Sequence, residues 1–312
     1  MKAVRFHQYG DPDVLVYEEA QRPAPGSGEV LVRVAATTFN AVDAGIRSGN
    51  RQGPFPVTLP HIPGIDLAGT VEELGEGVAS AEVGDEVIAF LPIVPDGAAA
   101  EYVVAPAEIL APAPSNIPLA DAAAIPTVGL AAWQALFEHG GLTAGQHVLV
   151  NGAGGAVGGY AVQLAKGAGA DVLATASPRS IERVRAAGAD EVIDYTTTGV
   201  ATALTEPVDV VLNLAPIEPD EFDRLTDLVR RGGAVVSTTL WMPAPSDEQR
   251  GVRGIDVVAR SDAEDLSRLA QLVARGELRV EVSERVPLSE LAAVHARAEA
   301  GELPVKVLVL PT

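Results

Sequence analysis

A run of small residues, 151–158, has the composition and the setting of a loop that binds phosphate groups. It follows a short apolar run at 147–150. A helix-period pattern begins within it, with one face formed by Val157, Tyr160, Ala161, Leu164, Ala165 and Ala168. Counted from Ala153, the run matches a relaxed Gly-x-Gly-x-x-Gly, with Gly155 and Gly158 at the later glycine positions. This order of strand, turn and helix predicts a dinucleotide-binding βαβ unit, and the alternative is a flexible loop in an alanine-rich protein.

Each position of the turn has an expected role. Ala153 is expected to make the tight turn, Gly155 to let the backbone approach a pyrophosphate, and Gly158 to let the helix pack closely on the strand. The N-terminus of the helix would offer free N–H groups and a positive dipole end to the phosphates. The other candidate cofactor contacts in the turn are Gly154, Ala156 and Val157.

The end of the next expected strand, 171–176, indicates which dinucleotide is bound. NAD sites place an acidic residue there to hold the ribose 2′-hydroxyl, and this sequence has none. Ser177 and Arg179 follow instead, and a guanidinium suits the 2′-phosphate of NADPH. We therefore expect NADPH, with the alternative that Arg179 is a solvated helix residue without a ligand.

Further cofactor contacts are expected where other strands end, because ligands of a doubly wound sheet lie across the carboxyl ends of its strands. Apolar runs at 208–212, 234–238 and 255–259 are the expected strands. Two of these ends are Asn213-Leu214-Ala215 and Ser237-Thr238-Thr239, and the candidate contacts there are Leu214, Ala215 and Thr238.

Length and composition exclude several classes of protein. The 312 residues exceed the size at which one core usually keeps growing, so two domains are expected. With 42 acidic and 22 basic residues, the formal charge of −20 opposes binding to nucleic acid and to anionic membranes. The sequence contains no cysteine, which excludes disulfides and thiolate sites, and its first residues do not resemble a signal peptide. A cytoplasmic location is the expectation.

The pattern of expected secondary structure changes twice along the sequence. Residues 1–117 contain short β-type runs separated by prolines and glycines, with the clearest strand around residues 30–34. Residues 118–277 alternate helices with apolar strands, which predicts an α/β doubly wound parallel sheet of the Rossmann type. In 278–312 short strands return, including one at 305–310, so this tail is expected to rejoin the first domain.

Several segments, taken in order, resemble one family. They are residues 39–43, 62–71, 84–87, 100–102 and 131–133, the glycine turn, and residues 188–193. Together they resemble the zinc-independent quinone oxidoreductase branch, similar to zeta-crystallin, of the medium-chain dehydrogenase/reductase superfamily. The resemblance implies a mainly β, GroES-like catalytic domain beside the Rossmann domain, and a homodimer formed by sheet extension.

The positions that bind catalytic zinc in related alcohol dehydrogenases hold other residues here. Asn40 matches the position of a cysteine ligand, and Gly64-Ile65-Asp66 matches a Gly-His-Glu motif, so the imidazole is also missing. The four-cysteine structural zinc lobe is absent from the sequence as well. No metal is therefore expected, and no zinc would polarise a carbonyl.

Without a Lewis acid, the reactions that remain easy are those in which a conjugated carbon accepts the hydride. A quinone or an α,β-unsaturated carbonyl then becomes a hydroquinone anion or an enolate, which hydrogen bonds can stabilise. The resemblance implies this same NADPH-dependent activity. Asn40 is the candidate that orients or stabilises the oxyanion, and Asp43 the candidate that holds its loop. The alternative is that both only cap a helix at 41–47.

The resemblance also assigns three more cofactor contacts: Tyr195 near the adenosine phosphate, Thr127 near the nicotinamide ribose, and Lys306 where the tail crosses the cleft. The sequence departs from its relatives at Gly45 and Arg51, where many of them have tyrosines. Solvent or His61 would then supply the proton, and Arg51 would favour an anionic or polar substrate. This departure leaves a second hypothesis open, that of an NADPH-binding sensor or structural protein with little turnover.

Overall fold

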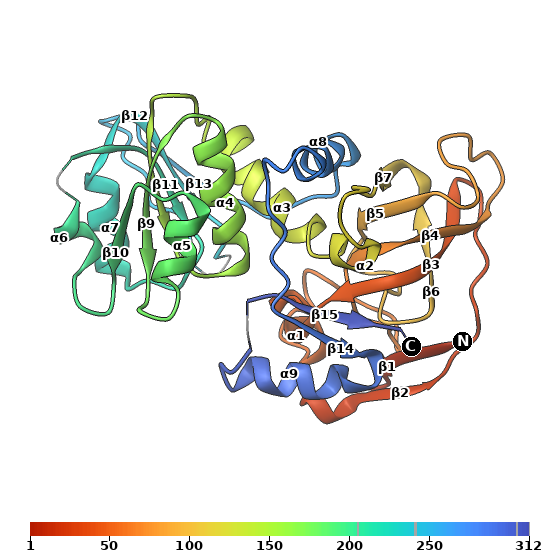
Figure 1. The fold of residues 1–312 in the computed structure, drawn as a ribbon. Coiled ribbons are helices and arrows are strands. Elements are labelled where there is room, and N and C mark those ends of the chain that lie inside the picture. The colour runs from red at the N-terminus through yellow and green to blue at the C-terminus, as the bar shows by residue number, and fades with distance from the viewer. Residues whose placement is uncertain (205, 240–241, 304, 312) are drawn as a thin grey trace. The chain divides into compact units, whose positions relative to one another are not determined.

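The computed structural model describes residues 1–204, 206–239, 242–303 and 305–311. Contacts divide the chain into two compact units (Figure 1). Unit 1 consists of Met1–Thr127 and Ser261–Thr312, and unit 2 of Val128–Arg260. These units are defined by packing, whereas the boundaries expected after residues 117 and 277 concern catalytic and cofactor-binding domains and remain a prediction.

Unit 2 is built on a parallel sheet of six strands, in the order β10-β9-β8-β11-β12-β13. In chain order these strands are β8 (His147–Asn151), β9 (Asp171–Ala176), β10 (Glu191–Asp194), β11 (Val208–Asn213), β12 (Val229–Ser237) and β13 (Arg253–Asp256). Numbered within the unit, this order is 3-2-1-4-5-6, that of the dinucleotide-binding Rossmann fold. The doubly wound parallel sheet predicted from the sequence is confirmed.

Helices cover both faces of this sheet. They are α4 (Ala156–Gly167), α5 (Ile181–Ala187), α6 (Val200–Ala203) and α7 (Pro219–Asp227). Leu149 packs with Phe222 and Leu225 of α7 on one face. Its neighbours Val148 and Val150 point to the other face, because successive side chains of a strand alternate. Both faces are therefore buried, which explains why the strands are uninterrupted apolar runs.

The strand limits differ from those expected from the apolar runs. β12 begins at Val229 rather than at residue 234, and β13 covers Arg253–Asp256 rather than 255–259. β15 likewise begins at Val307 rather than at 305. Apolar runs mark buried side chains, whereas backbone hydrogen bonds to the neighbouring strand set the limits, so the two disagree by a few residues.

Unit 1 is mainly β. Its strands are β1 (Lys2–Phe6), β2 (Leu15–Glu19), β3 (Glu29–Thr38), β4 (Asp66–Leu74), β5 (Glu86–Phe90), β6 (Tyr102–Pro106), β7 (Ala111–Pro112), β14 (Glu284–Pro287) and β15 (Val307–Leu310). β1 and β2 form a hairpin-like pair, and seven strands form one sheet in which β3 pairs with β4, β6 and β15. The C-terminal strand thus joins the sheet begun by the N-terminal segment.

Helices and short turns complete the two units. Unit 1 contains α1 (Ala41–Arg47), α2 (Leu119–Ala122), α8 (Ala263–Ala274) and α9 (Leu291–Glu299), with 3-10 turns at Pro12–Val14, Ala107–Ile109 and Leu288–Glu290. The Asp262 side chain caps α8 by accepting from Asp265 N. α3 (Pro126–Trp133) continues into a π-helix, Gln134–His139. Within the described residues, Leu119–His139 is long and apolar enough to cross a membrane, but 72% of its most apolar window is buried in the fold, as in a core helix.

The glycine turn shows why two of its positions need glycine. Gly152, with φ +86°, is the left-handed residue, so the tight turn expected at Ala153 lies one residue earlier. Ala153 is buried, and only glycine adopts the left-handed conformation here at no cost. A Cβ on Gly158 would lie 2.5 Å from the Ala153 Cα and 2.6 Å from the Gly152 oxygen. The turn and the first turn of α4 therefore pack backbone to backbone.

We predict that Gly158→Ala destabilises the protein, because the added methyl group overlaps backbone atoms that cannot move independently. Overpacking of this kind costs about 1–3 kcal/mol. Chemical denaturation followed by circular dichroism measures the loss. Gly155→Ala is the matched control, since its Cβ meets nothing closer than the Gly152 oxygen at 3.5 Å. Equal stability of the two variants would show that the backbone contact at Gly158 is unimportant.

Candidate active site

The start of α4 has the features of a phosphate-binding site. Gly155 is the N-cap residue, and no side chain of the described chain caps the helix there. The first N–H groups of α4, from Ala156, Val157 and Gly158, therefore keep their donor capacity, and the helix dipole adds positive potential. Gly155 is exposed, and a Cβ there would face open space apart from the Gly152 oxygen. These features fit the pyrophosphate of a dinucleotide.

Residues of the following strand-to-helix segment hold the turn in place. A Cβ on Gly154 would lie 2.5 Å from the Ser180 Oγ, so Ser180 packs directly on the turn. Arg183 of α5 donates a hydrogen bond to the Gly154 oxygen. Neither Ser180 nor Arg183 was a sequence-based candidate, because both stand in an ordinary helix-start pattern.

Ser177, Arg179 and Tyr195 gather at the carboxyl end of β9. Arg179 is exposed and has no hydrogen bond or ion pair to any described residue. The Tyr195 backbone N–H donates to the Ala176 oxygen at 3.3 Å, and its side chain is 54% exposed. An exposed guanidinium, a hydroxyl and an aromatic ring therefore stand together beyond a strand end that has no acidic residue.

The candidates at the other strand ends lie beside β8 and β11. Leu214 N donates to the Asn151 oxygen at 2.9 Å, and Thr238 N donates to the Asn213 oxygen at 3.1 Å. A Cβ on Gly152 would meet the Ala215 Cβ at 2.9 Å, so Ala215 touches the glycine turn. Leu214, Ala215 and Thr238 are all half-buried, and they form the rim of the sheet around the turn.

Buried polar side chains lie beneath this rim, and the sequence did not show that they would meet. Asn151, Thr175, Asn213 and Ser237 are each at or near the last residue of an apolar strand. That position was a usable signal, since an apolar strand rarely ends in a buried polar side chain without a partner.

Unit 1 has a separate polar cluster, formed by Thr38, Asn40, Asp66, Thr127 and Lys306. The Lys306 ammonium donates to Asp66 Oδ2 and to Asn40 Oδ1, at 3.1 Å each. The Asn40 Nδ2 donates to Asp66 Oδ2 at 2.9 Å and to Thr38 Oγ1 at 3.3 Å. The hydroxyl of Thr38 and the N–H of Thr127 also donate to Asp66. Asp66 and Lys306 are buried, so their charges compensate each other.

The electrostatics of the cluster depend on Asp66. Burial by itself raises the pKa of this carboxyl, but the Lys306 ammonium and the bonds from Asn40, Thr38 and Thr127 together bring the pKa below its ordinary value. Asp66 is thus ionised at neutral pH. Lys306 has three N–H donors and bonds two acceptors among the described residues, so one donor remains.

The cluster changes the role expected for Asn40. Both hydrogens of its amide are already donated, to Asp66 and Thr38, so Asn40 holds Lys306 and Asp66 rather than offering a free donor. The N–H of Thr127 donates to Asp66, and its buried hydroxyl has no partner among the described residues, so its expected place near the nicotinamide ribose stays a prediction.

Asp43 ties the Asn40 loop to a neighbouring segment. Its carboxylate accepts from Asn40 N at 3.0 Å and from Gly64 N at 3.1 Å. Burial raises the pKa of Asp43 to about 7, although the two N–H donors oppose the shift. The bond to Asn40 N is one half of a capping box at the start of α1, so the capping role considered for Asp43 is real.

His61 is a poor proton donor. The side chain is buried and makes an edge contact with Phe6, with the Asp96 carboxylate 3.5 Å from Nδ1. Burial lowers the pKa of His61 to about 4, so the ring is neutral at pH 7 and has no imidazolium proton to give. Of the two proton sources considered from the sequence, solvent is the one that fits.

Gly45 and Arg51, the positions at which relatives have tyrosines, contact each other. A Cβ on Gly45 would lie 2.8 Å from the Arg51 Cγ. The aliphatic part of Arg51 thus occupies the space that a side chain at position 45 would need, and the two departures are structurally linked.

The residues at the former zinc positions do not suit a metal ion. Asn40 is committed to the hydrogen bonds above, and Ile65 has no ligand atom. Among the described residues, no group of three or more histidine, cysteine, aspartate and glutamate side chains is arranged to hold a metal.

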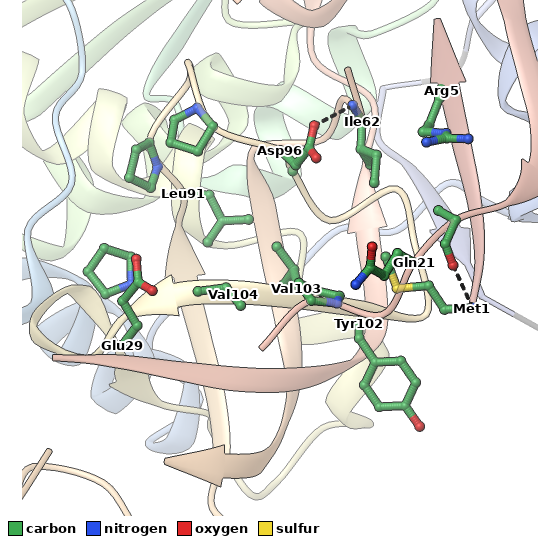
Figure 2. A pocket seen from close by; sticks show the side chains of 16 residues that line it. Met1, Arg5, Gln21, Glu29, Ile62, Leu91, Asp96, Tyr102, Val103 and Val104 are labelled. Carbon is green, nitrogen blue, oxygen red and sulfur yellow. Dashed lines mark hydrogen bonds between the residues drawn. The ribbon is translucent and has the colours of Figure 1, made fainter. Parts of the chain in front are cut away.

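A pocket of about 380 Å³ lies elsewhere in unit 1 (Figure 2). Its walls come mainly from β6 and from the 91–97 connection, and Asp96 accepts from Ile62 N at its edge. Asn40, Asp43, Asp66 and Lys306 do not line it. The pocket is therefore separate from the polar cluster.

Comparison with known proteins identifies the class. The chain matches the alcohol dehydrogenase GroES-like domain over residues 26–115 and the zinc-binding dehydrogenase domain over residues 187–309. In an alignment of 327 positions that covers all of this chain, it is 34% identical to a chloroplast envelope quinone oxidoreductase homolog of Arabidopsis thaliana, of which it covers 98%. An alignment of the same length, which again covers all of this chain, gives 34% identity to the chloroplastic NADPH-dependent alkenal/one oxidoreductase of that plant, of which it covers 80%.

Comparison with solved structures leads to the same class of protein. The quinone oxidoreductase from Coxiella burnetii matches with a TM-score of 0.88 at 29% identity, and the match covers 100% of this chain and 99% of that chain. The protein belongs to the quinone oxidoreductase branch of the medium-chain dehydrogenase/reductase superfamily, which confirms the resemblance seen in the sequence. It is an oxidoreductase that uses a nicotinamide cofactor and a small-molecule substrate.

We predict that His61→Phe makes the protein less sensitive to acid. The pKa of His61 is about 4 in the folded protein and 6.5 when exposed, so folding excludes the proton. The stability linked to this group is present above pH 6.5 and is lost as the pH falls to about 4, by about 3 kcal/mol at most. Urea denaturation between pH 7 and pH 4 measures the slope. His295, whose pKa burial lowers to about 3, keeps part of the slope in the variant. Identical slopes would show that His61 is not buried as described.

Proposed function

We propose that this enzyme catalyses the NADPH-dependent, metal-independent two-electron reduction of a quinone or an α,β-unsaturated carbonyl. The observation that supports this most directly is the polar cluster of unit 1, which contains a buried ammonium, Lys306, hydrogen-bonded to Asp66 and Asn40. The glycine turn and the uncapped start of α4 support the cofactor site. Relatives named quinone oxidoreductase and alkenal/one oxidoreductase support the substrate class.

The residues of the polar cluster of unit 1 have different roles in binding a substrate oxygen. When bound, the nicotinamide supplies a hydride to a conjugated carbon, and the two electrons leave negative charge on the substrate oxygen. The remaining N–H of Lys306 donates to that oxygen, in a setting where a charged donor is worth more than in water. Asn40 and Asp66 orient Lys306 by accepting its hydrogen bonds. Solvent supplies the proton that completes the reduction, since His61 is neutral.

The preference for NADPH rests on the carboxyl end of β9. Arg179 is exposed and has no partner among the described residues, which leaves its guanidinium available to a 2′-phosphate. Ser177 adds a hydroxyl donor, and Tyr195 adds a ring surface for the adenosine. The formal charge of −20 makes such a local positive group necessary for an anionic cofactor.

We expect the enzyme to oxidise NADPH, followed at 340 nm, with quinones or enones as acceptors and to keep its full rate after dialysis against a chelator. Saturated ketones serve as the control substrates, because without a Lewis acid they are poor hydride acceptors. Binding of NADPH without turnover of any acceptor would favour the sensor hypothesis. Activity that is lost on chelation and restored by zinc would contradict the metal-independent mechanism.

Arg179→Ala is expected to weaken NADPH binding roughly 10- to 100-fold, the value of one charge-assisted hydrogen bond. NADH lacks the 2′-phosphate and should bind nearly as before. Fluorescence titration at one moderate salt concentration compares the two cofactors. Arg185→Ala is the matched control, because Arg185 is an exposed arginine of α5 paired with Glu182. Equal losses for NADH and NADPH would remove Arg179 from the phosphate site.

A further inference from the structure

Five buried side chains form one hydrogen-bonded row across the carboxyl end of the parallel sheet. Thr175 is on β9, Asn151 on β8, Asn213 on β11 and Ser237 on β12, and Thr239 follows β12. These strands are neighbours in the sheet, so the row runs sideways over four strands. All five residues are buried. The sequence placed Asn213, Ser237 and Thr239 at strand ends but did not predict the row, and none of the roles discussed so far uses it.

The row begins at the glycine turn. Gly152 N donates to Thr175 Oγ1 at 2.8 Å, which satisfies the left-handed residue of the turn. Because Thr175 accepts there, its own hydrogen goes to Asn151 Oδ1, at 2.8 Å. This bond fixes which end of the Asn151 amide is the oxygen. Its Nδ2 then donates to Asn213 Oδ1 at 2.7 Å.

The row ends in a pair of hydroxyls. Asn213 Nδ2 donates to Thr239 Oγ1 at 3.2 Å and to Ser237 Oγ at 3.4 Å, and the two hydroxyl oxygens are 2.7 Å apart. Ser237 Oγ also accepts from Thr239 N at 3.2 Å. If Thr239 donated to Ser237, that oxygen would have three donors for two lone pairs. Ser237 must therefore donate to Thr239, which leaves the Thr239 hydroxyl hydrogen without an acceptor among the described residues.

The direction of the row follows the expected path of the cofactor. In a sheet of order 3-2-1-4-5-6, one mononucleotide half lies over strands 1 to 3 and the other over strands 4 to 6, with the pyrophosphate at the first glycine turn. Thr175 is on strand 2, and Asn151 and Asn213 face each other across strands 1 and 4, in register. Ser237 ends strand 5, and Thr239 follows that strand. The row therefore connects the adenosine half to the nicotinamide half.

We propose that this row is a positioning element for the nicotinamide cofactor. At one end Thr175 sets the pyrophosphate turn through Gly152, and at the other end the spare Thr239 hydroxyl donates to an oxygen acceptor of the nicotinamide half. The hydrogen bond between Asn151 and Asn213 fixes the distance between these two ends of the row, across the point where the strand order reverses. The inference rests on the nicotinamide cofactor, and it is independent of which quinone or enone is the substrate.

The test separates the two halves by using a fragment. 2′-Phospho-ADP has the adenosine and pyrophosphate of NADPH but neither the second ribose nor the nicotinamide. Thr175→Val removes a hydroxyl with little change of shape, and we expect it to weaken NADPH and the fragment alike, roughly 3- to 30-fold. Thr239→Val should weaken NADPH by a similar factor and leave the fragment unchanged. NADH and ADP, titrated in parallel, give the same pattern if the NADPH preference proposed above is wrong.

Three further measurements serve as controls for this interpretation. Thr175→Ser and Thr239→Ser keep the hydroxyls and should restore binding to within about twofold of the wild type. Thr226→Val is the matched control, because the Thr226 hydroxyl bonds the Phe222 oxygen inside α7, away from the row. Thermal unfolding of each variant without cofactor shows whether it is folded before titration. Unchanged NADPH affinity in both valine variants, or loss of fragment binding in Thr239→Val, would overturn the proposal.

Discussion

The ionised carboxylate of Asp66, buried in unit 1, is the constraint on which the rest of that unit's site depends. An isolated charge in such a place would be unstable, so it requires several donors at once. Thr38 and Asn40 supply two of them from the end of β3 and the start of α1, Thr127 supplies a backbone N–H, and Lys306 supplies the opposite charge. Segments from distant parts of the sequence are thereby held at one point.

This arrangement supports our proposal that the enzyme works without zinc. The Asn40 amide and Lys306 occupy hydrogen-bonding positions around Asp66, and under this proposal the buried ammonium provides positive potential for a substrate oxygen. An ammonium is a weaker electrophile than a metal ion, so the arrangement suits acceptors whose product anion is already delocalised. Quinones and enones have this property, and saturated ketones do not.

In unit 2, too, buried polar side chains require hydrogen-bond partners, and there the partners are neutral groups. The carboxyl ends of four parallel strands bring buried amides and hydroxyls together, and each must find a partner. In the buried row of unit 2, the hydrogen bonds all point in one direction, because its first member, Thr175, must accept from Gly152 N. The row continues through Asn151 and Asn213 to Ser237 and Thr239. Neutral partners cost less to bury than ions.

The sequence by itself was sufficient to predict the structural elements that are indicated by local patterns of residues. The apolar runs, the glycine turn and the helix after it predicted the doubly wound sheet, because periodicity and glycine content reflect local backbone geometry. The absence of a histidine at Ile65 and of any cysteine was also readable without a structure. The tight turn was placed at Ala153 instead of Gly152, since a relaxed motif does not show which residue has positive φ.

The tertiary structure alone decided which polar side chains meet. Lys306 and Asp66 are 240 positions apart in the sequence, and nothing near either residue indicates that the two charges pair. Asn40 was identified as important, but its role depends on hydrogen bonds to Asp66, Thr38 and Lys306 that only the fold creates. His61 looked like a loop histidine available to donate a proton, and its burial against Phe6 makes it neutral. The physical reason is common to all three: the charge and donor capacity of a side chain depend on the partners and the burial that the folded chain provides, whereas the sequence specifies only its type.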